Sequence, residues 1–312
     1  MSNLLRQHGL PLSEAMVFGL SSALVFAYFP FVKVGGLPLV SYRMPPRSII
    51  KNLQKPLRMR VRFETFRQPE AAQARLDELL QQGQLIGLQT SVYWLPYFPQ
   101  DLRFHFNAHN LLVFGKEGDD YLISDPVFEE VMRCSAADLQ KARFATGALA
   151  PKGMLYVLQS PPHMPDWSRA LPTAIRKTCR TMLYAPIPLV GVRGIRMLAR
   201  AVRRLPVDDA HKSGLFIGHI VRMQEEIGTG GAGFRFLYAA FLQEAADLLQ
   251  RPVLQDLSEQ LVAIGDQWRE WALLCARMLR GRQPLEPAVL ADRLEELAQA
   301  EQHFFRRLLR AL

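Results

Sequence analysis

Short apolar runs, each about as long as a β-strand, mark the first half of the chain. The runs "LIGLQTSVYWL", "NLLVFGKEGDDYLISDP" and "GMLYVLQ" predict strands, and the second contains the turn "KEGDD", which predicts a β-hairpin. Helical patterns interrupt them: "LPLSEAMVFGL" is capped by Ser13, and "PEAAQARLDELLQQGQ" ends at Gly83. In "CSAADLQKAR", Ser135 and Asp138 form a capping box. This half therefore predicts an α+β domain with an antiparallel sheet.

The second half of the chain has helical periodicity almost throughout. Apolar residues recur every three or four positions in "FRFLYAAFLQEAADLL", "VLQDLSEQLVAIGDQWREWALLCARML" and "VLADRLEELAQAEQHFFRRLLRAL". The segment "SPPHMPDW" holds three prolines, which can continue neither a helix nor a central strand, so it predicts a linker. We expect an α+β domain over residues 1–159 and an all-α domain over residues 160–312.

One uncharged stretch, Ala15 to Val32, has the hydropathy of a membrane helix. Pro30 and three small residues interrupt it, and Glu14 stands where a signal peptide would carry positive charge. A short helix followed by a buried strand explains the same pattern. We therefore expect neither a transmembrane segment nor an export signal.

Composition narrows the class of protein. Hydrophobic residues make up 49% of the chain and charged residues 21%, which favours a globular fold over disorder. The net charge of +9 favours an acidic partner, such as nucleic acid, an anionic membrane or an acidic protein. Three distant cysteines without CxxC spacing argue against a disulfide framework or a cysteine zinc site, and they fit a reducing cytoplasm.

His109 and Asp125 are the candidate catalytic residues. His109 opens one strand of the predicted hairpin and Asp125 closes the next, so antiparallel pairing would bring the two side chains together. A carboxylate that binds one imidazole nitrogen fixes the tautomer and leaves the other nitrogen to accept a proton. A packed or hydrogen-bonded structural histidine is the alternative interpretation. His105, four residues before His109, lacks a third ligand nearby, so we expect no metal site.

The sequence resembles a known family. "NLLRQHGLPLSEAMVFGL", "YWLPYF", "HFNAHNLLVFG" and "YLISDP" are similar to the amino-terminal domain of butirosin biosynthesis protein H. "EEIGTGGAGFRFLYAAFLQEAADLL" resembles the helical domain of unknown function that accompanies it. The resemblance covers most of the chain, in the order of the family.

The resemblance implies a papain-like domain of the bacteriocin-processing (C39-like) cysteine peptidase type. It further implies a Cys–His–Asp triad that moves an acyl group from an acyl carrier protein thioester to an amine. His109 would then be the base and Asp125 its orienting acid. The family's cysteine lies a few residues before "NLLRQHG", whereas this chain starts at Met1, inside that helix.

We expect either an upstream start that restores the cysteine or a chain that has lost catalysis, and we favour the first. Ser2 is displaced from the expected position. Cys134, just before a predicted helix, is the remaining candidate nucleophile, because a helix dipole could lower its pKa. Cys179 and Cys275 fall in helical segments and are interpreted as buried apolar side chains.

Two basic segments, "RALPTAIRKTCR" and "VRGIRMLARAVRR", suggest where a partner binds. In the second, five arginines gather on one helical side: Arg193, Arg196, Arg200, Arg203 and Arg204. This side could dock an acidic acyl carrier protein, whose phosphopantetheine arm would be the only cofactor involved. Membrane-surface binding and a simple solvated face are the alternatives, and no nucleic-acid-binding motif accompanies the arginines.

The expected function is thus acyl transfer in secondary-metabolite biosynthesis, with a small amine as acceptor. The chain as printed is expected to form no acyl-enzyme. A non-catalytic carrier-protein-binding module and a cysteine peptidase-like hydrolase are the two alternatives.

Overall fold

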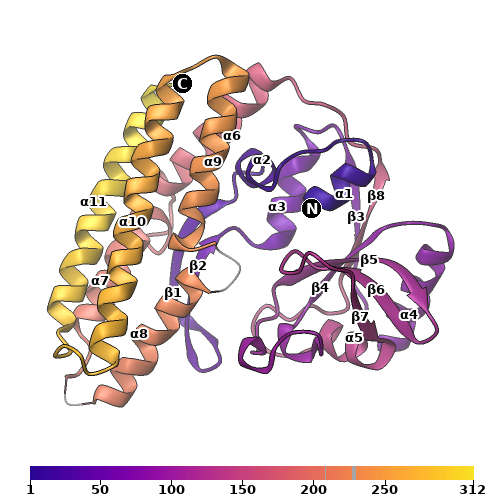
Figure 1. Ribbon diagram of the computed structural model, residues 1–312, viewed down its shortest axis with the longest axis horizontal. Coiled ribbons are helices and arrows are strands. Elements are labelled where there is room, and N and C mark those ends of the chain that lie inside the picture. Colours follow the sequence, from indigo (N-terminus) through magenta and orange to yellow (C-terminus); the bar gives the residue numbers. More distant parts are fainter. Residues whose placement is uncertain (208, 227–229) are drawn as a thin grey trace. The chain divides into compact units, whose positions relative to one another are not determined.

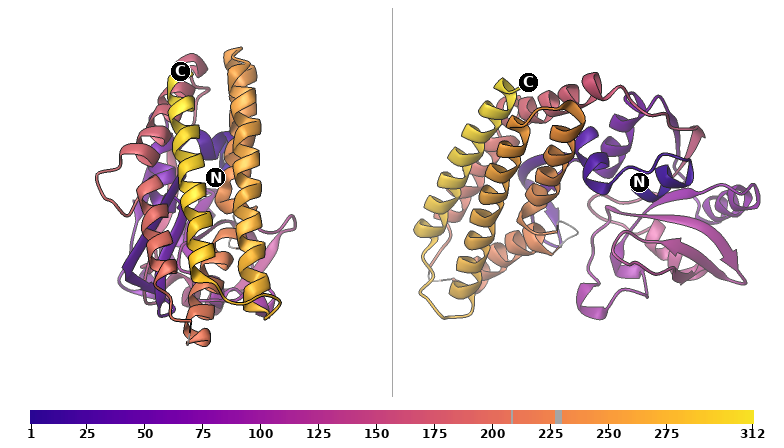
Figure 2. Two further views of the ribbon diagram at one scale, coloured as in Figure 1. Left: turned by 90° about the vertical axis from the view of Figure 1, so that its left-hand side faces the viewer. Right: turned by 45° about the horizontal axis from the view of Figure 1, so that its top comes forward.

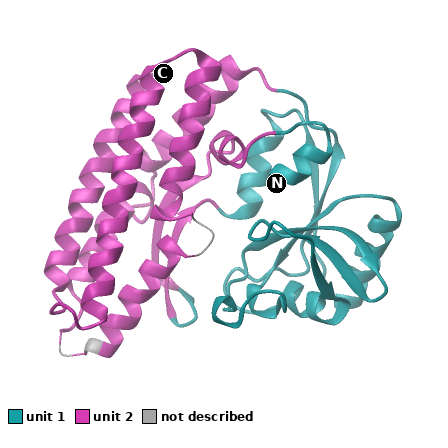
Figure 3. Cartoon of the chain, in the orientation of Figure 1, with its two compact units in different colours: residues 1–11, 33–36, 45–164 teal, residues 12–32, 37–44, 165–312 magenta. Residues whose placement is uncertain are grey.

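The computed structural model describes residues 1–207, 209–226 and 230–312. The chain forms two compact units (Figure 3). Unit 1 comprises residues 1–11, 33–36 and 45–164, and unit 2 comprises residues 12–32, 37–44 and 165–312. Each unit is built from three separate segments of the chain, whereas the expected domains 1–159 and 160–312 are continuous. The boundary between the expected domains stays a prediction.

Unit 1 contains a six-stranded antiparallel sheet (Figure 1). Its strands, in the order in which they pair, are β3 (Arg60–Glu64), β8 (Leu155–Ser160), β4 (Ile86–Thr90), β5 (His109–Glu117), β6 (Asp120–Ser124) and β7 (Met132–Ser135). The predicted hairpin is confirmed as β5 and β6. The run "LIGLQTSVYWL" was predicted as one strand, but β4 ends at Thr90 and a 3-10 turn, η1 (Val92–Trp94), follows it.

The helices of unit 1 are short and pack around this sheet. They are α1 (Ser2–Gln7), α3 (Pro46–Gln54), α4 (Pro69–Gln81), α5 (Ala136–Arg143) and a second 3-10 turn, η2 (Gln100–Leu102). Leu76 of α4 and Leu139 of α5 lie in one core cluster with Leu111, Val113 and Ile123 of the hairpin. The predicted cap of α5 is confirmed, because the Ser135 hydroxyl accepts from the Asp138 N–H at 3.1 Å.

The uncharged stretch from residue 15 to residue 32 is a helix followed by a strand, as predicted. It forms most of α2 (Glu14–Leu20) and β1 (Leu24–Val34), and β1 continues through Gly35 and Gly36 into β2 (Leu37–Arg43). Both glycines have positive φ, 57° and 83°, as the two central residues of a type I′ hairpin turn require. Among the described residues, no helix is both long enough and apolar enough to cross a membrane.

This segment packs within unit 2. The Phe26 ring of β1 stacks on Trp268 with centroids 6.1 Å apart. A Cβ on Gly19 of α2 would stand 2.0 Å from the ring of Phe241, so only glycine fits there. The apolar stretch is therefore part of the core of unit 2, although it lies early in the sequence.

Long helices form the remainder of unit 2, as the periodicity predicts. They are α6 (Trp167–Tyr184), α7 (Gly191–Arg203), α8 (Ala210–Glu225), α9 (Arg235–Leu249), α10 (Val253–Leu279) and α11 (Pro287–Arg310), with a 3-10 turn, η3 (Ala232–Phe234). Helix α7 packs on α11, and α9 packs on both α10 and α2. Figure 2 shows α10 and α11 running side by side.

Candidate active site

Strands β5 and β6 bring His109 and Asp125 together. Leu112 pairs with Ser124 across the two strands, so Asp125, one residue further, returns beside the start of β5. His109 Nε2 lies 2.6 Å from Asp125 Oδ2, a hydrogen-bond distance. The first part of the expected geometry, an imidazole bound to a carboxylate, is present.

The carboxylate of Asp125 is held from two further directions. Its side chain is fully buried, the Tyr97 hydroxyl donates to Oδ2 at 2.8 Å, and the Val127 N–H donates to Oδ1 at 3.0 Å. Burial, and next the charge of Asp125, raise the pKa of Tyr97, so this phenol keeps its proton and remains a donor. Three donors thus fix the carboxylate in one orientation.

Aromatic rings surround the imidazole of His109. Phe98 meets it edge-on with centroids 5.5 Å apart, and Phe128 packs against both Phe98 and Tyr97. The His109 side chain is 11% exposed, so a reactant can reach it while most of the ring is shielded from water. Because a carboxylate can only accept, Nε2 is the protonated nitrogen and Nδ1 is the one that can accept a proton.

No local pattern in the sequence indicates that Tyr97 and Thr90 lie beside the His109–Asp125 pair. Tyr97 lies in "VYWLPYF", whose aromatic side chains suggest either an acyl-binding groove or aromatic packing. Tyr97 and Phe98 pack inward, whereas Tyr93 and Trp94 are 40% and 37% exposed. Thr90 of β4 pairs with His109 of β5 and is fully buried. Its hydroxyl has no hydrogen-bond partner in the part of the chain that the structure describes.

His105 is separate from the pair. Its ring is exposed and stacks on Tyr93 with centroids 4.0 Å apart. Within the described residues, no group of three or more His, Cys, Asp or Glu side chains could hold a metal ion. His105 is therefore a useful control for variants of His109.

Helix α1 is joined to the strand that leads to Asp125. Asn3 Nδ2 donates to Ser124 Oγ at 3.0 Å, and Ser124 immediately precedes Asp125. Side chains alternate along a strand, so Ser124 and Asp125 point to opposite faces of the sheet. Leu4 and Leu5 anchor the helix, since both are fully buried.

The three cysteines are buried structural thiols. Cys134 on β7 belongs to the core cluster of unit 1, and burial raises its pKa to about 12. Cys179 on α6 and Cys275 on α10 are fully buried, and burial raises the pKa of each thiol. Burial opposes the low pKa that a nucleophilic thiol needs, so Cys134 does not suit the role considered for it.

We therefore expect the folded chain to resist thiol reagents. With a pKa of about 12, roughly one Cys134 in ten thousand is a thiolate at pH 8, and access is blocked as well. Ellman's reagent added at pH 8 should give almost no rapid colour, and after unfolding in guanidinium it should report the 3 thiols of the sequence. A rapid reaction of one thiol in the folded chain would contradict this expectation.

The comparisons with known proteins bear on both halves of the chain. Residues 137–308, more than half of the chain, match the family model described as Domain of unknown function (DUF4872). The chain belongs to this family. Residues 1–126 match the model of Butirosin biosynthesis protein H, N-terminal, so both parts of the resemblance are confirmed in their order. No curated protein matches the chain.

His109 and Asp125 both lie within the butirosin-H-type domain, at residues 1–126. The five arginines considered for partner binding lie within the DUF4872 match and on or next to α7. Helix α11 engages two of them: Arg203 Nη2 lies 2.5 Å from Asp292 Oδ1, and Arg196 Nε lies 3.6 Å from Glu295 Oε2.

Arg193 is engaged as well, because it donates to the carbonyls of Ala185 and Pro186. Arg200 and Arg204 remain exposed. Three of the five arginines thus make contacts within unit 2, which weakens this side as a docking face.

Proposed function

We propose that this chain acts in acyl transfer from an acyl carrier protein thioester to a small amine in secondary-metabolite biosynthesis. His109 is the general base and Asp125 the group that orients it. The observation that carries the proposal is the 2.6 Å contact between His109 Nε2 and a buried carboxylate that Tyr97 and Val127 also hold. The match to the butirosin-H-type domain supports the same chemistry.

The proposed reaction has two steps. His109 takes the proton of a cysteine thiol, the thiolate attacks the thioester carbonyl, and the carrier's phosphopantetheine sulfur leaves with the proton from His109. An amine then attacks the acyl-cysteine, His109 accepts the amine's proton, and the cysteine thiolate leaves. Asp125 stabilises the imidazolium in both steps without taking its proton.

The attacking thiol in this proposal is none of the three cysteines of the chain. All three are buried and their pKa values are raised, so the proposal places the thiol outside residues 1–312. Phosphopantetheine is likewise supplied by the carrier protein and not by this chain.

The test compares two forms of the protein by intact mass after incubation with an acylated carrier protein. Residues 1–312 alone should gain no acyl group. The same chain with a short extension ahead of Met1 that carries one cysteine should gain one, and should pass it to an added amine. In the extended form, His109→Ala should slow acylation by about 10²–10⁴-fold, the usual contribution of a general base.

His105→Ala in the extended form is the matched control and should acylate at the unchanged rate, because His105 stacks on Tyr93 away from Asp125. Acylation of Cys134, or equal rates in the two histidine variants, would overturn the proposal. Carrier binding without any acylation would favour a non-catalytic binding module. Peptide cleavage that outpaces amine acylation would favour a peptidase.

A further inference from the structure

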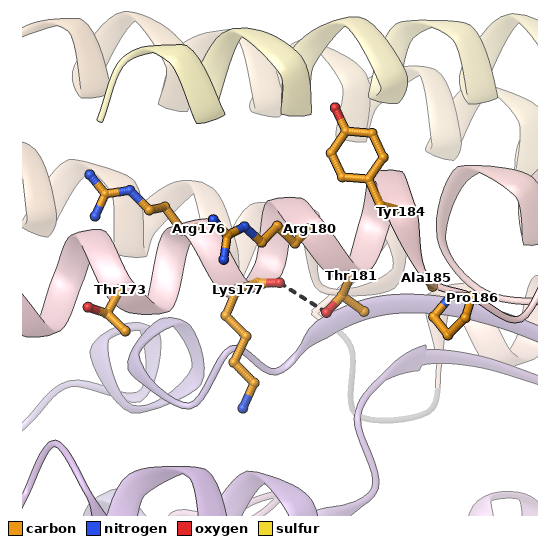
Figure 4. A pocket seen from close by; sticks show the side chains of 8 residues that line it. All are labelled: Thr173, Arg176, Lys177, Arg180, Thr181, Tyr184, Ala185 and Pro186. Atoms are coloured by element: carbon orange, nitrogen blue, oxygen red, sulfur yellow. Dashed lines mark hydrogen bonds between the residues drawn. The ribbon is translucent and has the colours of Figure 1, made fainter.

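A basic groove runs along the exposed side of α6, in unit 2 (Figure 4). It encloses about 700 Å³, and its walls come from α6 and the two residues that follow it. The residues that define it here are Arg176, Lys177, Arg180, Thr181, Tyr184 and Pro186. The opposite side of α6, with Leu171, Ile175, Cys179 and Met182, is buried in the core of unit 2.

The side chains that line the groove carry positive charge. Three of its side chains are cationic, and no carboxylate is among the described residues that line it. Arg176 donates to an oxygen of Leu312, the last residue of the printed chain, at 3.0 Å, whereas Arg180 is exposed and makes no ion pair with any residue that the structure describes. This contrasts with α7, where Arg196 and Arg203 already face acidic residues of α11.

A fourth cation lies at the end of the groove. Arg193 binds the carbonyl oxygens of Ala185 and Pro186, and these two residues line the groove. The guanidinium thereby holds the chain in place after α6. It also adds positive potential beside Tyr184, so the whole groove favours an anionic ligand.

Apolar surface accompanies the charge. Tyr184 is 62% exposed, and Ile187, next to Pro186, is 50% exposed. Tyrosine and arginine are, with tryptophan, enriched among the residues that contribute most to binding at protein interfaces. A groove with both suits a protein partner better than a free ion.

We propose that this groove docks the acidic carrier protein that donates the acyl group. This inference rests on the proposed function, in which a phosphopantetheine-bearing carrier is the substrate. The planar guanidinium of Arg180 suits the phosphodiester of the arm, because two N–H groups can bind one phosphate. Tyr184 and Ile187 pack against the carrier, and the remaining cations attract its acidic surface.

The buried side of α6 argues against a membrane as the partner. A helix that binds a bilayer surface lays an apolar face into the lipid. The apolar face of α6 is already used in the core of unit 2, and only single apolar residues remain exposed at its end. The charge pattern therefore fits a folded acidic partner.

The experiment measures the dissociation constant of the full chain for a holo acyl carrier protein and for its apo form, which lacks the phosphodiester arm. Arg180→Glu should raise the constant for the holo form at least about tenfold, as expected for a reversed charge in an interface. The same substitution should also reduce the difference between the dissociation constants for the holo and apo forms. The matched control is Arg200→Glu, the same change at an exposed arginine of α7, and it should stay within about twofold of wild type.

His109→Ala keeps the two proposals apart, since it should bind the holo carrier as wild type does. Carrier binding that depends on Arg180, together with no acylation of the cysteine-extended form, would support the docking site and sink the proposed function. Equal weakening by Arg180→Glu and Arg200→Glu would overturn the docking site. So would tighter, Arg180-dependent binding to anionic vesicles or RNA than to the carrier.

Discussion

Replacing Glu301 by alanine should lower the free energy of unfolding of unit 2 by about 3–5 kcal/mol, the cost of leaving a buried charge unpaired. Glu301 on α11 is fully buried. Its Oε1 accepts from Arg235 Nε at 2.9 Å and from the indole N–H of Trp268 at 2.7 Å. The Arg235 guanidinium also lies over the rings of Trp268 and Tyr42.

The loss is large because the alanine variant leaves two buried donors, Arg235 and Trp268, without their carboxylate acceptor. Arg235 is fully buried, so without Glu301 its guanidinium loses its carboxylate partner and keeps the bond to the Gly233 carbonyl at 2.9 Å. The network also joins α9, α10 and α11 with β2, so its disruption affects the centre of unit 2.

Urea unfolding followed by circular dichroism measures the effect. Glu296→Ala is the matched control on the same helix: Glu296 pairs with Arg293, and both side chains are 62% exposed. An exposed pair contributes less than about 1 kcal/mol, so the control should shift the midpoint little. Equal losses in the two variants would mean that the buried pair has no special role in stability.

Asp125→Asn should slow acyl transfer in the cysteine-extended form by about 10²–10⁴-fold while leaving the fold intact. The amide has the size of the carboxylate, and with its oxygen in the place of Oδ1 it can still accept from the Val127 N–H. It can also offer an N–H to His109 Nε2, which favours the wrong tautomer, and it stabilises an imidazolium poorly. The loss should therefore appear in the transfer rate and not in carrier binding.

Asp77→Asn is the control for this substitution. Asp77 accepts from the Tyr121 hydroxyl at 2.7 Å, much as Asp125 accepts from Tyr97, but its other partner is Lys116 and not a histidine. It should transfer at the wild-type rate once its folded fraction is taken into account. If both variants lost the same activity, the effect of Asp125 would be structural and not specific to His109.

Local signals in the sequence were enough to predict the hairpin that carries the candidate site. His109 opens β5 and Asp125 follows β6, because an apolar run, a turn and a proline mark these positions. The cap of α5 and the helix ended near Gly83 were predictable for the same reason. Elements defined by nearby residues can be recognised from one sequence.

Contacts between distant segments could not be predicted in this way. The run from residue 15 to residue 32 is apolar enough to be buried, but nothing in it says that its partners are α9 and α10. Strand β3 was not predicted, because "RVRFE" is mostly polar and takes its place only by pairing with β8. Tyr97 reaches Asp125 across 28 positions.

The arginines of α7 illustrate the same limit. Helical periodicity places them on one side of the helix, which suggested a face for a partner protein. The periodicity cannot reveal that Asp292 and Glu295 of α11 meet Arg203 and Arg196 there. The sequence pattern indicated a one-sided basic face only for α7 and not for α6, although the groove along α6 is the better candidate for docking.

The protonation pattern of the His109 ring decides whether Nδ1 can act as a base, and measuring it needs only the chain as printed. Long-range ¹H–¹⁵N NMR on histidine-labelled protein, at a pH where the ring is neutral, distinguishes the two tautomers. We expect a proton on Nε2, bound to Asp125, and none on Nδ1, with a change in Asp125→Asn and none in Asp77→Asn. A proton on Nδ1 in the wild-type chain would contradict the account, because that nitrogen could then accept nothing from a nucleophile.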